Sequence, residues 1–204
     1  PNRYDLHGVT GDLSLRRLHD IVITGGHFAS IYLSQCQRID ISGFEIDAPA
    51  YPTSDGQAVR ISNCTDVVVH DGVLRGALAT EGVDPAAKAL DKTGNVIGWP
   101  CGKAVNIDKG CSDCCITRLD ISGFHKGIVF AGARIKILRN RFTGLRTTPI
   151  SGSPGDSCEI RNNFASDSKP WNFGGKGDHG DRIHIWTDDV PITGLRIGNN
   201  VLLQ

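Results

Sequence analysis

The chain has 204 residues, of which 39% are hydrophobic, and its 22 basic residues balance 22 acidic ones. This length and apolar content predict one domain with a buried core, spanning residues 1–204. The even charge argues against a nucleic acid or an anionic membrane surface as partner, and the longest apolar run, near Gly127 to Ala133, is too short to cross a bilayer. Because the sequence begins at Pro1 and contains no methionine, we expect a processed or truncated product.

Short β-branched strands recur along the chain, each followed by a turn residue and then an apolar residue. They are DIVITGGHF from Asp20, RIDISGFEI from Arg38, DVVVHDGVL from Asp66, RLDISGF from Arg118 and RIKILRNRF from Arg134. Gly, Asn and Asp in the turn tolerate positive φ, as a sharp corner requires. The later segments IRNNF and IGNNV predict that Asn162 and Asn199 share the corner position of Asn140.

A second set of strands predicts how successive coils align. The segments SIYLSQC, AVRISNC, AVNIDKG, GIVFAGA and RIHIWTD align on Ile31, Val59, Val105, Ile128 and Ile183, with steps of 28, 46, 23 and 55 residues. The step of 46 contains an insertion, and the step of 55 covers two coils by way of Ile150. A repeat of just over twenty residues with several short strands is typical of a solenoid. Leucine-rich repeats are disfavoured because their Leu-x-x-Leu-x-Leu spacing is missing.

The coil pattern and the corner asparagines resemble those of the pectate-lyase-like superfamily. From about Asp20 onward, the resemblance implies an all-β, right-handed parallel β-helix with coils of about 22–28 residues and one insertion loop at about 79–103. A solenoid exposes a raw sheet edge at each end unless something caps it, and the closing NNVLLQ supplies no cap. We therefore expect further chain, or a partner in a homo-oligomer, to continue the stack.

Outward-pointing residues of the second set of strands form columns with a spacing of about 4.8 Å from coil to coil. These columns, together with the glycine-rich GGKGDHGD before the last strand, contain the candidate site residues. We predict four catalytic residues, Lys103, Lys126, Asp181 and His184. We predict seven substrate-binding residues, Gln57, Arg60, Asn106, Asp108, Asp178, His179 and Trp186. Each of them taken singly could also be an ordinary solvated or turn residue.

Members of the resembled superfamily mostly act on polysaccharides, which implies a polysaccharide partner and an extracellular or virion-associated location. Cleavage of an acidic polymer by β-elimination needs a cation near the substrate carboxylate, a base and an acid. Lys103 and Lys126 suit the first two roles, since a lysine desolvated beside another cation has a lowered pKa. His184 is the alternative base or acid.

Two other functions remain open. Hydrolysis of a glycosidic bond would need two flanking carboxyl groups, for which Asp178 and Asp181 are candidates with Asp108 or Asp188 as partner. A phage tailspike-type depolymerase belongs with the hydrolase, whereas a non-catalytic carbohydrate-binding or structural module would use the same face without chemistry. We favour the lyase because the columns mix cations, amides and a histidine more than they pair carboxylates.

Metal and cysteine chemistry are weakly indicated. No cofactor is required, although Asp108, Asp178 or Asp181 could bind Ca²⁺. Seven cysteines leave at least one thiol unpaired within the chain, and CSDCC supplies only one knuckle of a zinc site. We therefore expect a local disulfide or stacked buried thiols, with Cys36 and Cys64 in one column.

Overall fold

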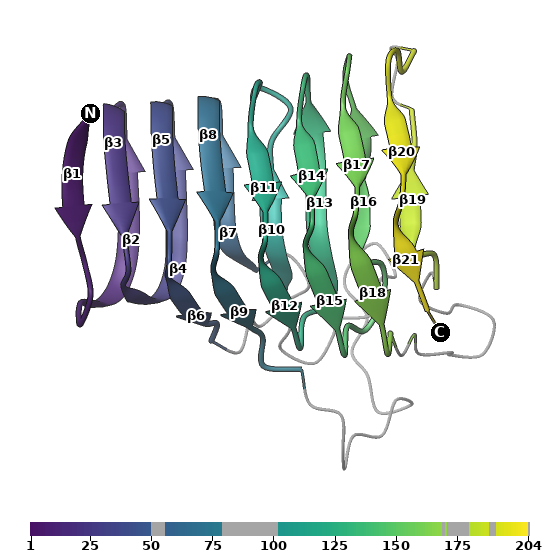
Figure 1. Ribbon diagram of the computed structural model, residues 1–204, viewed down its shortest axis with the longest axis horizontal. Helices are drawn as coiled ribbons and strands as arrows, with labels where there is room; N and C mark the ends of the chain where they lie inside the picture. The colour runs from purple at the N-terminus through teal and green to yellow at the C-terminus, as the bar shows by residue number, and fades with distance from the viewer. Residues whose placement is uncertain (50–55, 79–101, 169, 171–179, 188–190, 204) are drawn as a thin grey trace, which may run out of the picture.

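The computed structural model describes residues 1–49, 56–78, 102–168, 170, 180–187 and 191–203. Over these residues the chain is a parallel β-solenoid without a helix, in which short strands follow one another around a core and each coil lies beside the next (Figure 1). The two termini lie at opposite ends of the stack. In the described part of the chain, no helix has the length and apolar character needed to cross a membrane.

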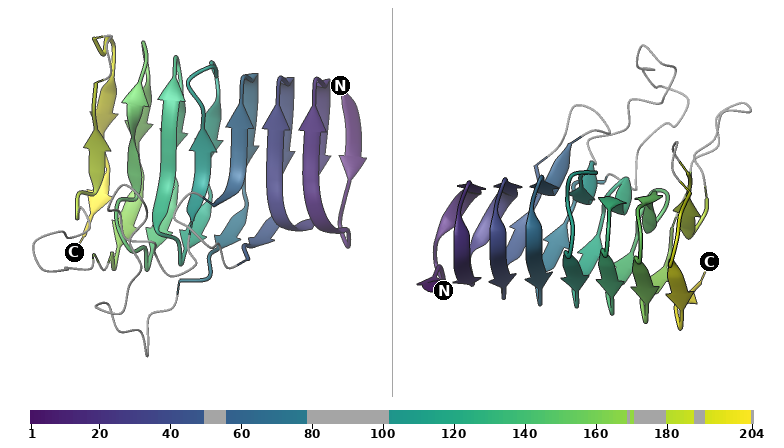
Figure 2. Two further views of the ribbon diagram at one scale, coloured as in Figure 1. Left: turned by 180° about the vertical axis from the view of Figure 1, so that it is seen from behind. Right: turned by 90° about the horizontal axis from the view of Figure 1, so that it is seen from above.

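Three faces surround the core, and we call them A, B and C. Face A contains β1 (Asn2–Asp5), β3 (His19–Thr24), β5 (Gln37–Ser42), β8 (Thr65–His70), β11 (Cys115–Thr117), β14 (Lys136–Leu138), β17 (Glu159–Arg161) and β20 (Arg196–Gly198). Face B contains β2 (Thr10–Arg16), β4 (His27–Ser34), β7 (Gln57–Ser62), β10 (Lys103–Ile107), β13 (Lys126–Gly132), β16 (Ile150–Pro154) and β19 (Ile183–Ile185). Face C contains β6 (Glu45–Asp47), β9 (Val73–Arg75), β12 (Asp120–Ser122), β15 (Arg141–Thr143), β18 (Phe164–Ser166) and β21 (Val201–Leu202). Figure 2 shows these strands from behind and from above.

Faces B and C meet in β4, which is long enough to serve both. Its start pairs with β6 through His27 and Phe28, and its end pairs with β7 from Ile31 to Ser34. In the following coils no single strand continues from face C to face B. A short strand ends on face C, and a separate strand begins on face B. The corner between faces C and B is therefore where residues can be added without disturbing the stack.

The predicted register of face B is confirmed. Val59 pairs with Ile31 and with Val105, and Ile128 pairs with Val105 and with Ile150. Ile150 in turn pairs with Ile183, so the coil inferred between Ile128 and Ile183 is present. These residues alternate with outward side chains because one face of each strand covers the core, where burial of an aliphatic side chain contributes about 1.5–3 kcal/mol.

Two sequence expectations about the coils were wrong. The segment RLDISGF resembles RIDISGF, but Asp120–Ser122 pairs with β9 and β15 on face C, whereas Gln37–Ser42 lies on face A. The face A strand of that later coil is Cys115–Thr117, which begins at the last cysteine of CSDCC, so RLDISGF comes one face later than RIDISGF. A coil also precedes the predicted start, since Leu13 of β2 pairs with Ile31 only 18 residues later.

Buried asparagines form a hydrogen-bonded ladder at the corner between faces A and C. Asn140 donates from its backbone N–H and from Nδ2 to Asn163 Oδ1, at 2.9 and 3.1 Å. Asn163 does the same to Asn200 Oδ1, at 2.9 and 3.0 Å. The predicted partners of Asn140 were Asn162 and Asn199, one residue too early. Asn162 and Asn199 have positive φ and align instead with Arg139.

Cys36, Cys64 and Cys111 form a stack of buried thiols in the core. The backbone N–H of Cys36 donates to Cys64 Sγ at 3.3 Å, and that of Cys64 donates to Cys111 Sγ at 3.5 Å. All six cysteines among the described residues are free, which confirms stacked thiols and excludes a disulfide between any two of them. Burial raises the pKa of Cys64 to about 11, as expected for a thiol removed from water. Cys101 lies outside the described residues.

Candidate functional site

Every predicted site residue that the structure describes lies on a strand of face B or within two residues of one. One column consists of Tyr32, Arg60, Asn106, Val129, Ser151 and His184, each the ladder partner of the next. Asp178 and His179 lie outside the described residues, as do residues 79–101 of the predicted insertion loop. We consider three groups along this face in turn.

The first group, which we call the lysine corner, consists of Gln57, Lys103 and Lys126. Lys103 is the ladder partner of both other residues, so the three side chains lie on three adjacent coils. All three are half-buried, and Gln57 Oε1 is a buried atom with no hydrogen-bond partner. Two cationic side chains about 4.8 Å apart at the backbone create a locally positive surface.

The next coil adds polar residues beside the lysine corner. The N–H of Arg146 donates to Phe124 O at 2.9 Å, and Thr147 Oγ1 donates to His125 O at 2.8 Å. Arg146 is fully buried, and Thr147 is 2% exposed. This stretch therefore stacks directly on the residues that precede Lys126. Because Arg146 and His125 stand in an irregular corner instead of a strand, the alternation pattern gave no signal for them.

A second group surrounds Tyr32 near the start of the stack. An open depression of about 410 Å³ is lined by Arg16, Ser30, Ile31, Tyr32, Gln57 and Arg60, and we call it the tyrosine depression. The guanidinium carbons of Arg16 and Arg60 lie 5.0 and 5.7 Å from the centre of the Tyr32 ring. Such cation–π contacts hold two positive groups around an aromatic platform. Tyr32 and Arg16 were not among the predicted site residues, although Tyr32 stands in the predicted column.

Asp108 is held by its neighbours on the same face. Its Oδ2 accepts hydrogen bonds from Arg60 Nε and Nη2 at 3.3 and 3.1 Å, and its Oδ1 accepts one from Asn106 Nδ2 at 2.6 Å. Asn106 is 8% exposed. These contacts fix the Arg60 head group above β7 and occupy both oxygens of the carboxylate, which leaves Asp108 poorly placed to bind Ca²⁺.

The third group, at the last strand of face B, is the serine–histidine cluster of Ser151, Asp181 and His184. His184 Nδ1 lies 2.8 Å from Asp181 Oδ2, and the ring of Trp186 meets the His184 ring edge-on with centres 5.6 Å apart. Ser151, the ladder partner of His184, is 2% exposed, and its Oγ has no hydrogen-bond partner. Ser151 is not among the predicted site residues, because the coil of Ile150 is less regular in sequence than the others.

The predicted catalytic residues divide into two places. Lys103 and Lys126 are adjacent, and Asp181 and His184 are adjacent, but β16 lies between β13 and β19. At about 4.8 Å per ladder step, His184 is about 10 Å along the stack from Lys126 and about 14 Å from Lys103. The four residues therefore do not form one catalytic centre.

Within the described part of the chain, no three or more His, Cys, Asp or Glu side chains are grouped so as to hold a metal ion. No protein-family model matches the chain, and no curated protein sequence matches it either.

Proposed function

We propose that this chain is a right-handed parallel β-helix of the pectate-lyase-like kind that binds an acidic polysaccharide along face B and cleaves it by β-elimination. The observation that carries the proposal is the lysine corner, where Lys103 and Lys126 are ladder partners at the edge of a long polar face. Arg16 extends the positive surface toward the start of the stack, and Arg60, which is ion-paired with Asp108, lies between Arg16 and the lysine corner.

The chemistry assigns separate roles to the two lysines. One ammonium group neutralises the carboxylate of a uronate, which makes the hydrogen on the neighbouring carbon more acidic. The other lysine, as a neutral amine, removes that hydrogen as a proton, and the electron pair forms the carbon–carbon double bond while the glycosidic oxygen leaves. His125, next to Lys126 in the chain, is the candidate acid for the leaving oxygen, since His184 is too distant.

Hydrolysis by Asp108 and Asp181 is disfavoured by their spacing. They belong to β10 and β19 coils, which are three ladder steps and about 14 Å apart, whereas glycosidase carboxyl groups are about 5–9.5 Å apart. Binding without cleavage, as in a carbohydrate-binding or adhesive module, is the second candidate, and the tyrosine depression favours it. Either function suits an extracellular or virion-associated protein.

The test is a screen of the purified protein against acidic and neutral polysaccharides, with and without Ca²⁺. Ultraviolet absorbance reports the unsaturated product of elimination, and reducing ends report any chain cleavage. Both signals should rise together on an acidic polymer. Reducing ends without absorbance would replace the lyase by a hydrolase, and neither signal from folded protein would leave binding or a structural role.

Variants of the lysine corner locate the activity. Lys126→Arg keeps the positive charge but removes the amine that can act as a base, so we expect turnover to fall by about a hundred-fold or more. Lys136→Arg on face A is the matched control, because its side chain is exposed on a different sheet. Equal activity of the two variants would show that Lys126 is not the base.

A further inference from the structure

Ser151 combines burial with an unused hydroxyl group. It lies on β16, is 2% exposed, and its Oγ forms no hydrogen bond. A buried polar group without a partner costs about 1–3 kcal/mol of stability, so such groups are rare in structural positions. Alanine would fill the position at no such cost, which indicates that the hydroxyl has a use other than packing.

The column on face B determines what the hydroxyl can reach. The ladder partners of Ser151 are Val129 on one side and His184 on the other. Ladder partners in a parallel sheet point to the same side and are about 4.8 Å apart at the backbone. Because valine has no polar atom, His184 is the column neighbour with which Ser151 can exchange a proton.

Asp181, the third member of the serine–histidine cluster, orients the imidazole ring of His184. Asp181 Oδ2 lies 2.8 Å from His184 Nδ1, and a carboxylate at that nitrogen holds the proton there. The lone pair of the neutral ring is then on Nε2, the nitrogen that can receive a proton from a hydroxyl group. A nucleophile, a base beside it and a carboxylate that orients the base are the parts shared by serine hydrolases on unrelated folds.

We propose that Ser151, His184 and Asp181 form a second centre that hydrolyses carboxylic esters. The substrates are small acyl groups, such as acetyl, carried by the hydroxyl groups of the polymer on face B. The identity of the polymer rests on the proposed function, but the ester chemistry does not. The deep position of Ser151 restricts the acyl group to a small one, because its carbonyl carbon must approach Oγ closely.

The reaction proceeds in two balanced steps. Ser151 Oγ attacks the carbonyl carbon while His184 Nε2 takes the hydroxyl proton, and the sugar oxygen then leaves with that proton, so that an acyl-serine remains. Water next attacks the acyl-serine and gives a proton to His184, and this proton returns to Ser151 Oγ as the carboxylic acid is released. No metal ion, oxidant or other reactant is consumed besides water.

The experiment uses the whole chain and small probes. Diisopropyl fluorophosphate is small enough for a deep hydroxyl, and peptide mass mapping identifies the serine that it modifies. We expect the adduct on Ser151 of the folded protein and not after urea unfolding. The rate of p-nitrophenyl acetate hydrolysis should fall at least about a hundred-fold in Ser151→Ala.

The control is Ser153→Ala, two residues along the same strand and on the same side. It should hydrolyse p-nitrophenyl acetate at the rate of the unchanged protein. In Asp181→Asn the loss should appear mainly in kcat, since the acyl group still binds but the ring is no longer held in the correct tautomer. An adduct elsewhere, or full activity in Ser151→Ala, overturns the proposal.

The two proposals fail separately. Nitrophenolate release needs no polysaccharide, whereas the unsaturated product of elimination needs no ester. Ester hydrolysis without elimination on any acidic polymer would keep the serine–histidine cluster and remove the lyase. Elimination without ester hydrolysis or labelling would do the reverse.

Discussion

Asn163 connects three successive coils through a single side chain. Its Oδ1 receives two hydrogen bonds from Asn140, and its Nδ2 donates to Ile137 O at 2.9 Å and to Asn200 Oδ1 at 3.0 Å. The residue is 1% exposed, so none of these groups can turn to water when its partner is removed. In a low-dielectric interior such a network is stabilising only while it is complete.

Replacing Asn163 with alanine should therefore destabilise the fold strongly. Asn163→Ala removes the acceptor of the Asn140 N–H, one of the two acceptors of Asn140 Nδ2, and the Nδ2 group that donates to Ile137 O, while Asn140 Nδ2 keeps its hydrogen bond to Ile116 O. We expect the free energy of unfolding to fall by about 2–4 kcal/mol. Urea unfolding followed by circular dichroism measures the change. The adjacent Asn162→Gly is the control, because an exposed residue with positive φ tolerates glycine, and it should change stability by less than about 1 kcal/mol. Similar losses in both variants would contradict the ladder.

The corner between faces A and C shows how far the position of one residue can be predicted from the sequence. Two adjacent asparagines occur in IRNNF and in IGNNV, and composition alone does not say which one turns inward. In each case the first has positive φ and the second joins the ladder, where Asn163 is buried and Asn200 is half-buried. Arg118 and Arg139 also adopt positive φ in this corner, which a rule based on Gly, Asn and Asp cannot predict.

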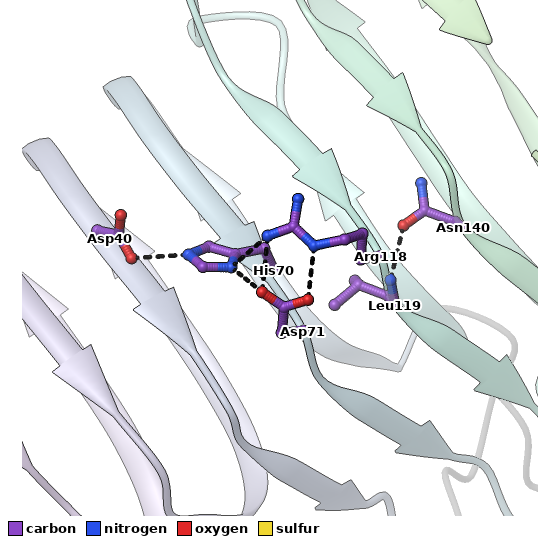
Figure 3. A network of polar contacts seen from close by, with 6 residues as sticks. All are labelled: Asp40, His70, Asp71, Arg118, Leu119 and Asn140. Atoms are coloured by element: carbon purple, nitrogen blue, oxygen red, sulfur yellow. Dashed lines mark hydrogen bonds and ion pairs between the residues drawn. The ribbon is translucent and has the colours of Figure 1, made fainter. Parts of the chain in front are cut away.

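At the scale of the strands, ion pairs connect neighbouring coils on the outside of face A. Arg118 donates from Nε and Nη2 to the two oxygens of Asp71, both at 2.6 Å, and His70 connects Asp71 to Asp40 of the preceding coil (Figure 3). Arg38 and Asp20 form a similar two-pronged pair. Arg118 and His70 hold the pKa of the Asp71 carboxyl group far below its ordinary value.

These pairs predict how stability depends on pH. Since the pKa of Asp71 is lowered in the folded state, its contribution is present above the ordinary aspartate value near 4 and is lost as the pH falls from there toward the folded value. The free energy of unfolding should decrease over that range, and less steeply in Asp71→Asn than in the unchanged protein. Urea unfolding at a series of pH values tests this. Parallel curves would show that Asp71 contributes nothing, as happens for many exposed ion pairs.

The register between strands could be predicted better than the face of the solenoid to which a strand belongs. Paired inward residues such as Val59 and Val105 align two coils even where an insertion separates them in the sequence, because every coil must supply apolar side chains to one core. The likeness of RIDISGF to RLDISGF was misleading because both faces A and C need the same short alternation. Which face a strand occupies depends on how many residues separate it from the preceding corner. The segment CSDCC changes this number, because it contains the start of the face A strand.

At the scale of the whole molecule, face B offers a long surface to an extended ligand. From β2 to β19 the strands are separated by six ladder steps, which is about 29 Å along the stack. The tyrosine depression lies near one end, the lysine corner follows, and Trp186 lies at the other end. A short oligosaccharide therefore contacts only part of this surface.

Binding of acidic oligosaccharides should become tighter with length and then stop improving. We expect affinity to rise until the ligand spans from Tyr32 to Trp186 and to level off beyond that length, as titration calorimetry over a size series would show. The affinity should fall with added salt, because Lys103, Lys126 and Arg60 interact with the ligand across solvent. Affinity that is independent of both length and salt would contradict binding along face B.

The part of the site that the sequence could predict is the part made by regular coils. Register alone predicts the alignment of four of its residues, because the core residues that align the strands also align their neighbours: Lys103, Lys126, Asn106 and Arg60. Ser151 was overlooked in an irregular coil, and Arg146 with His125 lies in a corner, where alternation carries no information. Side-chain pairing such as that of His184 with Asp181 depends on rotamers that no periodicity encodes.

The corner between faces C and B has a consequence for how new activities can arise on this scaffold. Residues 123–125 separate β12 from β13, whereas residues 76–102 separate β9 from β10, and yet both coils keep the same pairing on either side. Closing a longer loop costs only about 0.6 kcal/mol for each doubling of its length. Loops of different length and sequence can therefore replace one another at this junction. Ligand specificity can change in this way while the packing of the core stays the same.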